Sequence, residues 1–126
     1  MSDPRNLYRD EILEHFRHPQ NYGALKVFDK NSKQHNPLCG DVIEMYVRFS
    51  DDTIYDVGFV GQGCAISISA ASILTEYIKD KKTTNVSNIT DDEMLALLGV
   101  DVSEARKKCA LLSLFVLRDC TLEKNT

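Results

Sequence analysis

Three cysteines and one aspartate are the residues best suited to chemistry: Cys39, Asp41, Cys64 and Cys109. Cys39 and Asp41 lie two residues apart in the segment NPLCGD. Proline fixes φ there, and glycine permits backbone geometries that other residues avoid, so this turn can aim the thiol and the carboxylate in one direction. We predict that the four side chains form one metal site assembled from three distant segments.

The surroundings of the two later cysteines favour the thiolate form that binds metals. Cys64 follows the glycines of GQG and directly precedes a predicted helix, whose unpaired N–H groups and dipole stabilise a thiolate. Cys109 lies near the start of another predicted helix, with Arg106 one turn earlier and Lys108 beside it. Three thiolates and a carboxylate can bind Zn²⁺ tetrahedrally, and the same soft ligands suit an iron–sulfur cluster with Asp41 as its fourth ligand. The residues leave both possibilities open.

The remaining cysteine and the three histidines are predicted to lie outside this site. Cys120 is eleven residues beyond Cys109, a distance of about 16 Å along a helix, so a core position is favoured. His15 and His18 complement the C-terminal end of a predicted helix, and His35 is expected on the surface or at a sheet edge. No histidine stands in a recognisable Cys/His arrangement, which argues against a nucleophilic hydrolase.

Composition limits the class of protein. The 126 residues suggest a single domain over residues 1–126, with enough apolar residues, 43%, to fill a modest core. The formal charge is −4, and no cluster of basic residues is large enough to indicate a nucleic-acid partner. There is no apolar run of membrane-spanning length and no apolar signal core near the N-terminus. We therefore expect a cytoplasmic protein, in which four cysteines are not a disulfide framework.

The elements that must position the site follow from hydrophobic periodicity. The pattern switches to period two after Gly40, which predicts a β-hairpin with Tyr55, Val57 and Phe59 on one side of its second strand. The ends of this hairpin bring the Cys39 segment near Cys64. Before the hairpin, residues 29–33 are predicted to form a solvated turn or an edge strand. The predicted strands span residues 42–49 and 53–60, joined by a turn at residues 50–52.

Helical patterns flank the hairpin on both sides. The most specific is the short helix near residue 90, where Thr90 and Glu93 make a capping box and Gly99 is a C-cap. Residues 80–85 are predicted to be a polar loop. The predicted helices span residues 5–17, 65–79, 90–98 and 102–122.

Four segments resemble one family in order along nearly the whole chain. The segments NPLCGD, GQGCAIS and RKKCA, together with the pattern of Leu7, Tyr8, His15, Phe16 and Pro19, are similar to signatures of the U-type iron–sulfur cluster assembly proteins, namely IscU, SufU and the N-terminal domain of NifU. The resemblance implies a SufE/NifU-like α+β fold, with a small antiparallel sheet of about three strands and helices packed on one face. The site is then expected at one end of the sheet.

The resemblance also implies a function and roles for the candidate residues. The positions matching Cys39, Asp41, Cys64 and Cys109 bind zinc or a transient [2Fe–2S] cluster in that family. Fe²⁺ is therefore a further metal ion expected to bind at the site. Sulfur arrives as a persulfide from a PLP-dependent cysteine desulfurase, with Cys39 expected as the acceptor, Cys109 as its rival and Arg106 as an orienting or docking residue. Clusters or sulfur are passed to apo-protein acceptors. A scaffold, monomeric or weakly self-associating, is favoured over a turnover enzyme.

The subtype is left open between two members of the family. IscU-type scaffolds have a histidine before the last cysteine, where this chain has Lys108, as SufU-type zinc-dependent sulfurtransferases do. SufU proteins, however, carry an insertion between their second and third cysteines, whereas Cys64 and Cys109 are only 45 residues apart. A third alternative is a zinc-stabilised interaction module, against which the carboxylate of Asp41 argues because it is a more exchangeable ligand than cysteine or histidine.

Overall fold

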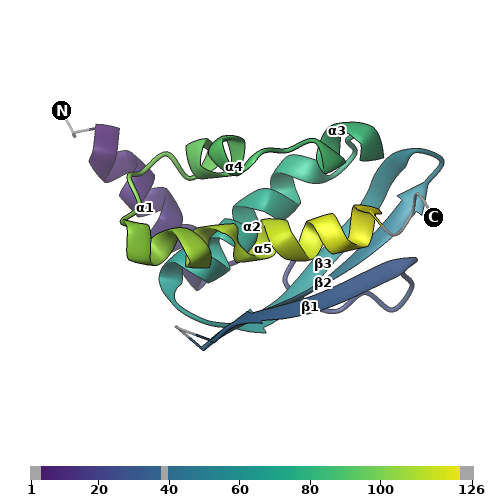
Figure 1. Cartoon of the computed structure of the whole chain (residues 1–126), viewed down its shortest axis with the longest axis horizontal. Helices are drawn as coiled ribbons and strands as arrows, with labels where there is room; N and C mark the ends of the chain where they lie inside the picture. The colour runs from purple at the N-terminus through teal and green to yellow at the C-terminus, as the bar shows by residue number, and fades with distance from the viewer. Residues whose placement is uncertain (1–3, 38–39, 123–126) are drawn as a thin grey trace.

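The computed structural model describes residues 4–37 and 40–122, so the predicted ligand Cys39 lies outside the described residues. Eight elements follow one another within these ranges (Figure 1): α1 (Pro4–Arg17), β1 (Lys30–Asn36), β2 (Asp41–Ser50), β3 (Thr53–Gln62), α2 (Ala65–Ile78), α3 (Thr83–Ser87), α4 (Asp91–Leu98) and α5 (Glu104–Leu122). No helix in the described part of the chain combines the length and apolar character needed to cross a membrane.

The three strands form one antiparallel sheet in the order β1-β2-β3, with the helices on one of its faces (Figure 1). The side chains of Ile43, Met45 and Val47 are fully buried beneath α2 and α5, while the residues between them lie on the other face. This alternation confirms the period-two prediction and the α+β class. Residues 30–36 form an edge strand, one of the two forms predicted for that region.

A β-bulge corrects one prediction about β3. Tyr55 is 53% exposed, whereas its neighbour Ile54 is fully buried, so the prediction that Tyr55 shares a side with Val57 and Phe59 is wrong. The pairing shifts between Arg48 and Phe49, because Arg48 pairs with Asp56 while Phe49 pairs with Ile54. The extra residue on β3 reverses the facing of every position before it.

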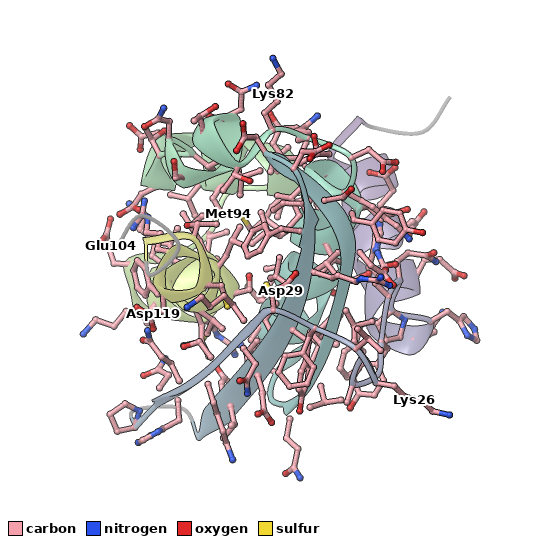
Figure 2. All side chains as sticks on the ribbon, turned by 90° about the vertical axis from the view of Figure 1, so that its right-hand side faces the viewer. Lys26, Asp29, Lys82, Met94, Glu104 and Asp119 are labelled. Carbon is pink, nitrogen blue, oxygen red and sulfur yellow. The ribbon has the colours of Figure 1, made fainter. Side chains whose placement is uncertain are left out.

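Helix α2 is buried on almost all sides. Small polar residues, including Ser69 and Ser72, are fully buried on it, because the helix runs between α1, the sheet and α5. The hydroxyls of these two serines make hydrogen bonds to α1: Ser69 Oγ donates to the carbonyl of Ile12 at 2.6 Å, and Ser72 Oγ lies 2.7 Å from His15 Nδ1. Figure 2 shows the same layering from one end of the molecule, with Met94 pointing inward and Lys82 outward.

Two helix boundaries near the end of the chain differ from the predictions. Residues 80–85, predicted as a polar loop, include the start of α3, because Thr83 is buried and its N–H and hydroxyl both bond to the carbonyl of Asp52 in the hairpin turn. Helix α5 begins at Glu104, two residues later than predicted. The capping of α4 is confirmed: the Thr90 hydroxyl accepts from the Glu93 N–H at 3.1 Å, and Gly99 closes the helix at a φ of 70°.

Candidate metal centre

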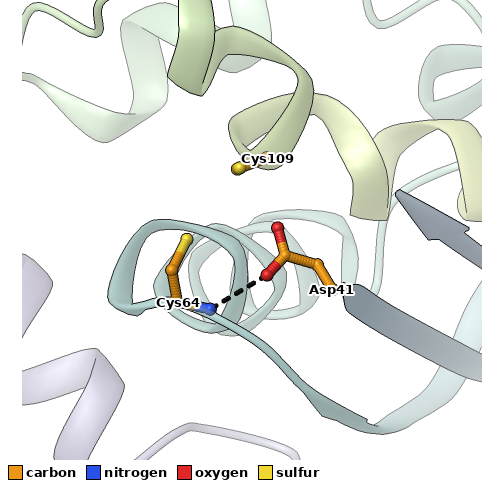
Figure 3. Close-up of side chains that lie close together, drawn as sticks. All are labelled: Asp41, Cys64 and Cys109. Atoms are coloured by element: carbon orange, nitrogen blue, oxygen red, sulfur yellow. Dashed lines mark hydrogen bonds between the residues drawn. The ribbon is translucent and has the colours of Figure 1, made fainter. Parts of the chain in front are cut away.

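Three of the four predicted ligands meet at the end of the sheet where α2 and α5 begin. Asp41 is the first residue of β2, Cys64 is the N-cap residue of α2, and Cys109 lies near the start of α5. One ligand atom from each lies within 4.8 Å of the others (Figure 3). The antiparallel pairing of β2 with β3 places the beginning of β2 beside the end of β3, which brings Asp41 and Cys64 together.

The two oxygens of the Asp41 carboxylate differ in their contacts. Gly40, at a φ of 72°, closes the preceding turn by donating its N–H to the carbonyl of Asn36 at 2.8 Å. Asp41 is 1% exposed, and its Oδ1 accepts from the Cys64 N–H at 3.0 Å. Its Oδ2 is buried without a hydrogen-bond partner among the described residues and points toward Cys109 (Figure 3). An unpartnered buried carboxylate oxygen is costly unless a cation binds it.

Cys64 is the N-cap residue of α2, although its side chain makes no capping hydrogen bond. Its backbone is extended, at φ −73° and ψ 170°, as an N-cap requires. Burial raises the pKa of the Cys64 thiol and the nearby Asp41 carboxylate raises it further. The backbone and hydroxyl of Ser67 and the backbone of Ile66 outweigh both effects, so this pKa lies below its ordinary value. The thiolate that binds metal is thereby favoured.

Cys109 presents its sulfur from a fully buried position on α5. The side-chain amide of Asn36, itself 6% exposed, donates to the Cys109 sulfur at 3.9 Å. Arg106 and Lys108, predicted to act on this cysteine, are both exposed. The docking role of Arg106 stays a prediction.

Two polar residues at the site were missed as functional candidates by sequence reasoning. Asn36 and Ser67 belong to the segments NPLCGD and GQGCAIS, but nothing in a single sequence says which polar neighbours of a cysteine contact its sulfur. Ser67 Oγ lies 3.8 Å from the Cys64 sulfur and donates to the Cys64 carbonyl at 3.1 Å. A helical spacing of three residues was the available signal for Ser67, whereas the Asn36 contact depends on tertiary packing.

The histidines and Cys120 lie outside the group of ligand atoms, as predicted. His18 and His35 are exposed, and Cys120 is fully buried in the apolar core. His15 instead joins α1 to α2: its Nδ1 lies 2.7 Å from Ser72 Oγ and its Nε2 lies 3.5 Å from a carboxylate oxygen of Glu76. These contacts give His15 a structural role.

Replacing His15 by alanine is therefore expected to destabilise the fold without affecting metal binding. Loss of the bond to Ser72 should lower the free energy of unfolding by about 1 kcal/mol, the usual net value of one such hydrogen bond. Urea denaturation would measure the change, and zinc stoichiometry should equal that of the wild type. The exposed His18 offers a control, since His18→Ala should change stability by less than about 0.5 kcal/mol. A lower zinc stoichiometry in His15→Ala would contradict this assignment.

The donor set fits a soft metal. Two sulfur atoms and one carboxylate oxygen of Asp41 converge within 4.8 Å, and Asp41 Oδ2 has no hydrogen-bond partner in the described part of the chain. Such ligands suit Zn²⁺ or the iron of an iron–sulfur cluster. Three ligands leave room for a fourth, the position for which Cys39 is the predicted residue.

Comparisons with known proteins agree with one another. The family model for the NifU-like N terminal domain matches residues 7–122. The zinc-dependent sulfurtransferase SufU of Bacillus subtilis (strain 168) is 37% identical over 127 aligned residues, covering 85% of this chain and 84% of that protein. The iron–sulfur cluster assembly scaffold protein IscU 1 of Archaeoglobus fulgidus is 32% identical over 112 residues, covering 89% of this chain and 72% of that protein.

A solved structure supports the fold. The N-terminal part of a nitrogen-fixing NifU-like protein from Brucella abortus superposes with a TM-score of 0.77 at 20% identity, covering 96% of this chain and 97% of that one. At this level of identity the likeness concerns the fold alone. The α+β arrangement of a three-stranded sheet covered by helices is thus shared with a NifU-like structure.

Proposed function

Because the chain belongs to the family of NifU-like N-terminal domains, we propose that it is an iron–sulfur cluster assembly protein that acts as a scaffold. It binds zinc or a transient [2Fe–2S] cluster at Cys39, Asp41, Cys64 and Cys109. Its sulfur comes from a PLP-dependent cysteine desulfurase, and its products go to apo-protein acceptors. The relatives named IscU scaffold and SufU sulfurtransferase support this class of function.

One observation carries the proposal: Asp41 brings a carboxylate oxygen within 4.8 Å of two cysteine sulfurs, and its buried Oδ2 has no hydrogen-bond partner among the described residues. A folded protein rarely leaves a carboxylate oxygen in that state without a cation to bind. A carboxylate is also a harder and more exchangeable ligand than a thiolate. The mixed donor set therefore suits a site that both loads and releases its metal.

The sulfur-transfer step is assigned to Cys39, with Cys109 as the rival acceptor. The Cys39 thiolate attacks the terminal sulfur of the persulfide on the desulfurase cysteine. A new S–S bond forms on Cys39, the S–S bond on the desulfurase breaks, and the desulfurase cysteine leaves as a thiolate. No net oxidation or reduction occurs. Arg106, exposed at the start of α5, is proposed to orient the docked desulfurase.

A second candidate is a zinc-dependent sulfurtransferase of the SufU type that stimulates its desulfurase. Lys108 favours it, because this residue stands where IscU-type scaffolds have histidine. The 37% identity to SufU of Bacillus subtilis supports it as well. In this alternative the zinc ion stays bound at the site, and the protein transfers sulfur without holding a cluster.

Measuring the metal and acid-labile sulfide content of anaerobically purified protein distinguishes the two functions. Iron with an equal amount of sulfide is the result expected of the scaffold, whereas about one zinc ion per chain without sulfide would favour the sulfurtransferase. Mass-spectrometric mapping after treatment with a desulfurase and cysteine should then find the persulfide on Cys39. Persulfide on Cys64 or Cys120 alone would contradict both acceptor assignments. Purified protein that binds neither metal, even after reconstitution, would refute the metal site.

A further inference from the structure

The hydroxyl of Ser67 lies between the carbonyl oxygen and the sulfur of Cys64 at the start of α2. It donates to the Cys64 carbonyl at 3.1 Å and lies 3.8 Å from the Cys64 sulfur, whose thiol proton it accepts. Ser67 is 1% exposed, so bulk water does not compete for these contacts. Among the described residues, both of these contacts are made with Cys64, which is a predicted metal ligand.

Metal binding must reverse one of these two hydrogen bonds. A metal-bound thiolate carries no proton and acts only as an acceptor, so the bond from the Cys64 sulfur to Ser67 Oγ cannot persist. The Ser67 hydroxyl is then a donor within reach of the sulfur. When the Ser67 hydroxyl rotates away from the Cys64 carbonyl, that oxygen still accepts a hydrogen bond, because the Ile68 N–H donates to it at 3.2 Å.

A second neutral donor contacts the sulfur of Cys109. Asn36 donates its side-chain amide to Cys109 at 3.9 Å from a buried position on β1. The ligand set gathers two thiolates and the carboxylate of Asp41 within 4.8 Å of one another. Neutral hydrogen-bond donors disperse this negative charge without adding a competing positive charge, and such outer partners also orient metal ligands.

We propose that Ser67 is a positioning residue of the metal site, whose hydroxyl turns from the Cys64 carbonyl to the Cys64 sulfur when metal binds. The hydrogen bond then orients the sulfur and withdraws charge from it. This inference rests on the proposed function, because it requires a metal at Asp41, Cys64 and Cys109. It assigns a role to a residue that is not itself a ligand.

The absorption spectrum of the cobalt-substituted protein tests the hydrogen bond from Ser67 to the Cys64 sulfur. With Co²⁺ as the probe, Ser67→Ala is expected to shift the thiolate-to-cobalt charge-transfer band to lower energy, since the sulfur lone pairs lose a stabilising donor. Zinc affinity, measured by competition with a chromophoric chelator, should fall about tenfold, as is usual for outer partners of metal ligands. Ser67→Thr keeps the hydroxyl and should restore the wild-type band. The band is recorded in the metal-loaded protein, so a loss of stability in the metal-free variant does not obscure it.

Ser69 supplies the matched control on the same helix. Its hydroxyl is fully buried and donates to the carbonyl of Ile12, away from the cysteines. Ser69→Ala should lower stability while leaving the cobalt band and zinc affinity unchanged. If the wild type binds metal and Ser67→Ala has the wild-type band and affinity, the role of Ser67 is refuted and the proposed function stands. If the wild type binds neither Co²⁺ nor Zn²⁺, the proposed function is refuted and the inference falls with it.

Discussion

Exchanging Asp41 for alanine is expected to lower the affinity for Zn²⁺ at least about 100-fold, because losing a ligand should cost no less than losing an outer partner, which costs about 10- to 100-fold. The substitution removes the Oδ2 atom that points toward Cys109 (Figure 3) and also the acceptor of the Cys64 N–H. Competition with a chelator of known affinity measures the loss. Zinc release should accelerate in proportion if loading is little affected.

The variant Asp41→Asn distinguishes the metal-binding role of Asp41 from its structural role. Asp41→Asn can keep an oxygen at the Cys64 N–H but offers no anionic oxygen to the metal, so zinc affinity should fall nearly as far as in Asp41→Ala. In the metal-free protein the same change is expected to raise the free energy of unfolding by about 1 kcal/mol, because a neutral amide costs less to bury than a carboxylate with an unpartnered oxygen. Metal would then stabilise the wild type more than the variant.

Asp29 provides the control for this pair of variants. Its carboxylate also accepts a backbone N–H, that of Phe49 at 2.8 Å, but it is exposed and lies outside the group of ligand atoms. Asp29→Asn should therefore leave zinc affinity unchanged. Wild-type zinc affinity in Asp41→Asn would remove the carboxylate from the ligand set and leave the cysteines to bind the metal.

The second large effect on stability and zinc affinity is expected for Gly63→Ala. A Cβ atom placed there would meet Ser67 Oγ and Asp41 Oδ1 at distances that Cβ atoms do not adopt. Gly63→Ala must therefore displace the carboxylate or the hydroxyl, which should destabilise the protein by about 1–3 kcal/mol, the usual cost of overpacking. Because one displaced group is a predicted ligand and the other contacts the Cys64 sulfur, zinc affinity should fall at least about tenfold as well.

The variant Gly23→Ala is the control for Gly63→Ala, because it introduces backbone strain without a steric collision. Its φ of 134° is unfavourable for any residue with a Cβ, but a Cβ there would meet no atom within 4 Å. Gly23→Ala should thus lower the melting temperature while its zinc affinity stays at the wild-type value. If Gly63→Ala keeps full zinc affinity, the tight packing around Asp41 has no part in holding the ligand.

Local sequence signals were sufficient to predict most elements and the kind of site. The alternation after Gly40 predicted the hairpin, and Thr90, Glu93 and Gly99 predicted both ends of α4, because periodicity and capping depend on residues a few positions apart. The same short range explains why the cysteine contexts indicated a metal site: the turn at Gly40 and the helix start at Cys64 are local features. The role of Cys39 and the docking role of Arg106 stay predictions.

Local sequence patterns therefore indicated most of the helices and strands and the types of metal ligand, whereas tertiary packing fixed which groups touch. The bulge opposite Arg48 turned Tyr55 outward, and the packing of α1 on α2 gave His15 a serine partner instead of a metal. Packing also placed Asn36 against Cys109, 73 residues away, and left one oxygen of Asp41 without a hydrogen-bond partner among the residues that the structure describes. Such contacts arise from the balance of burial over the whole chain, which no local pattern encodes.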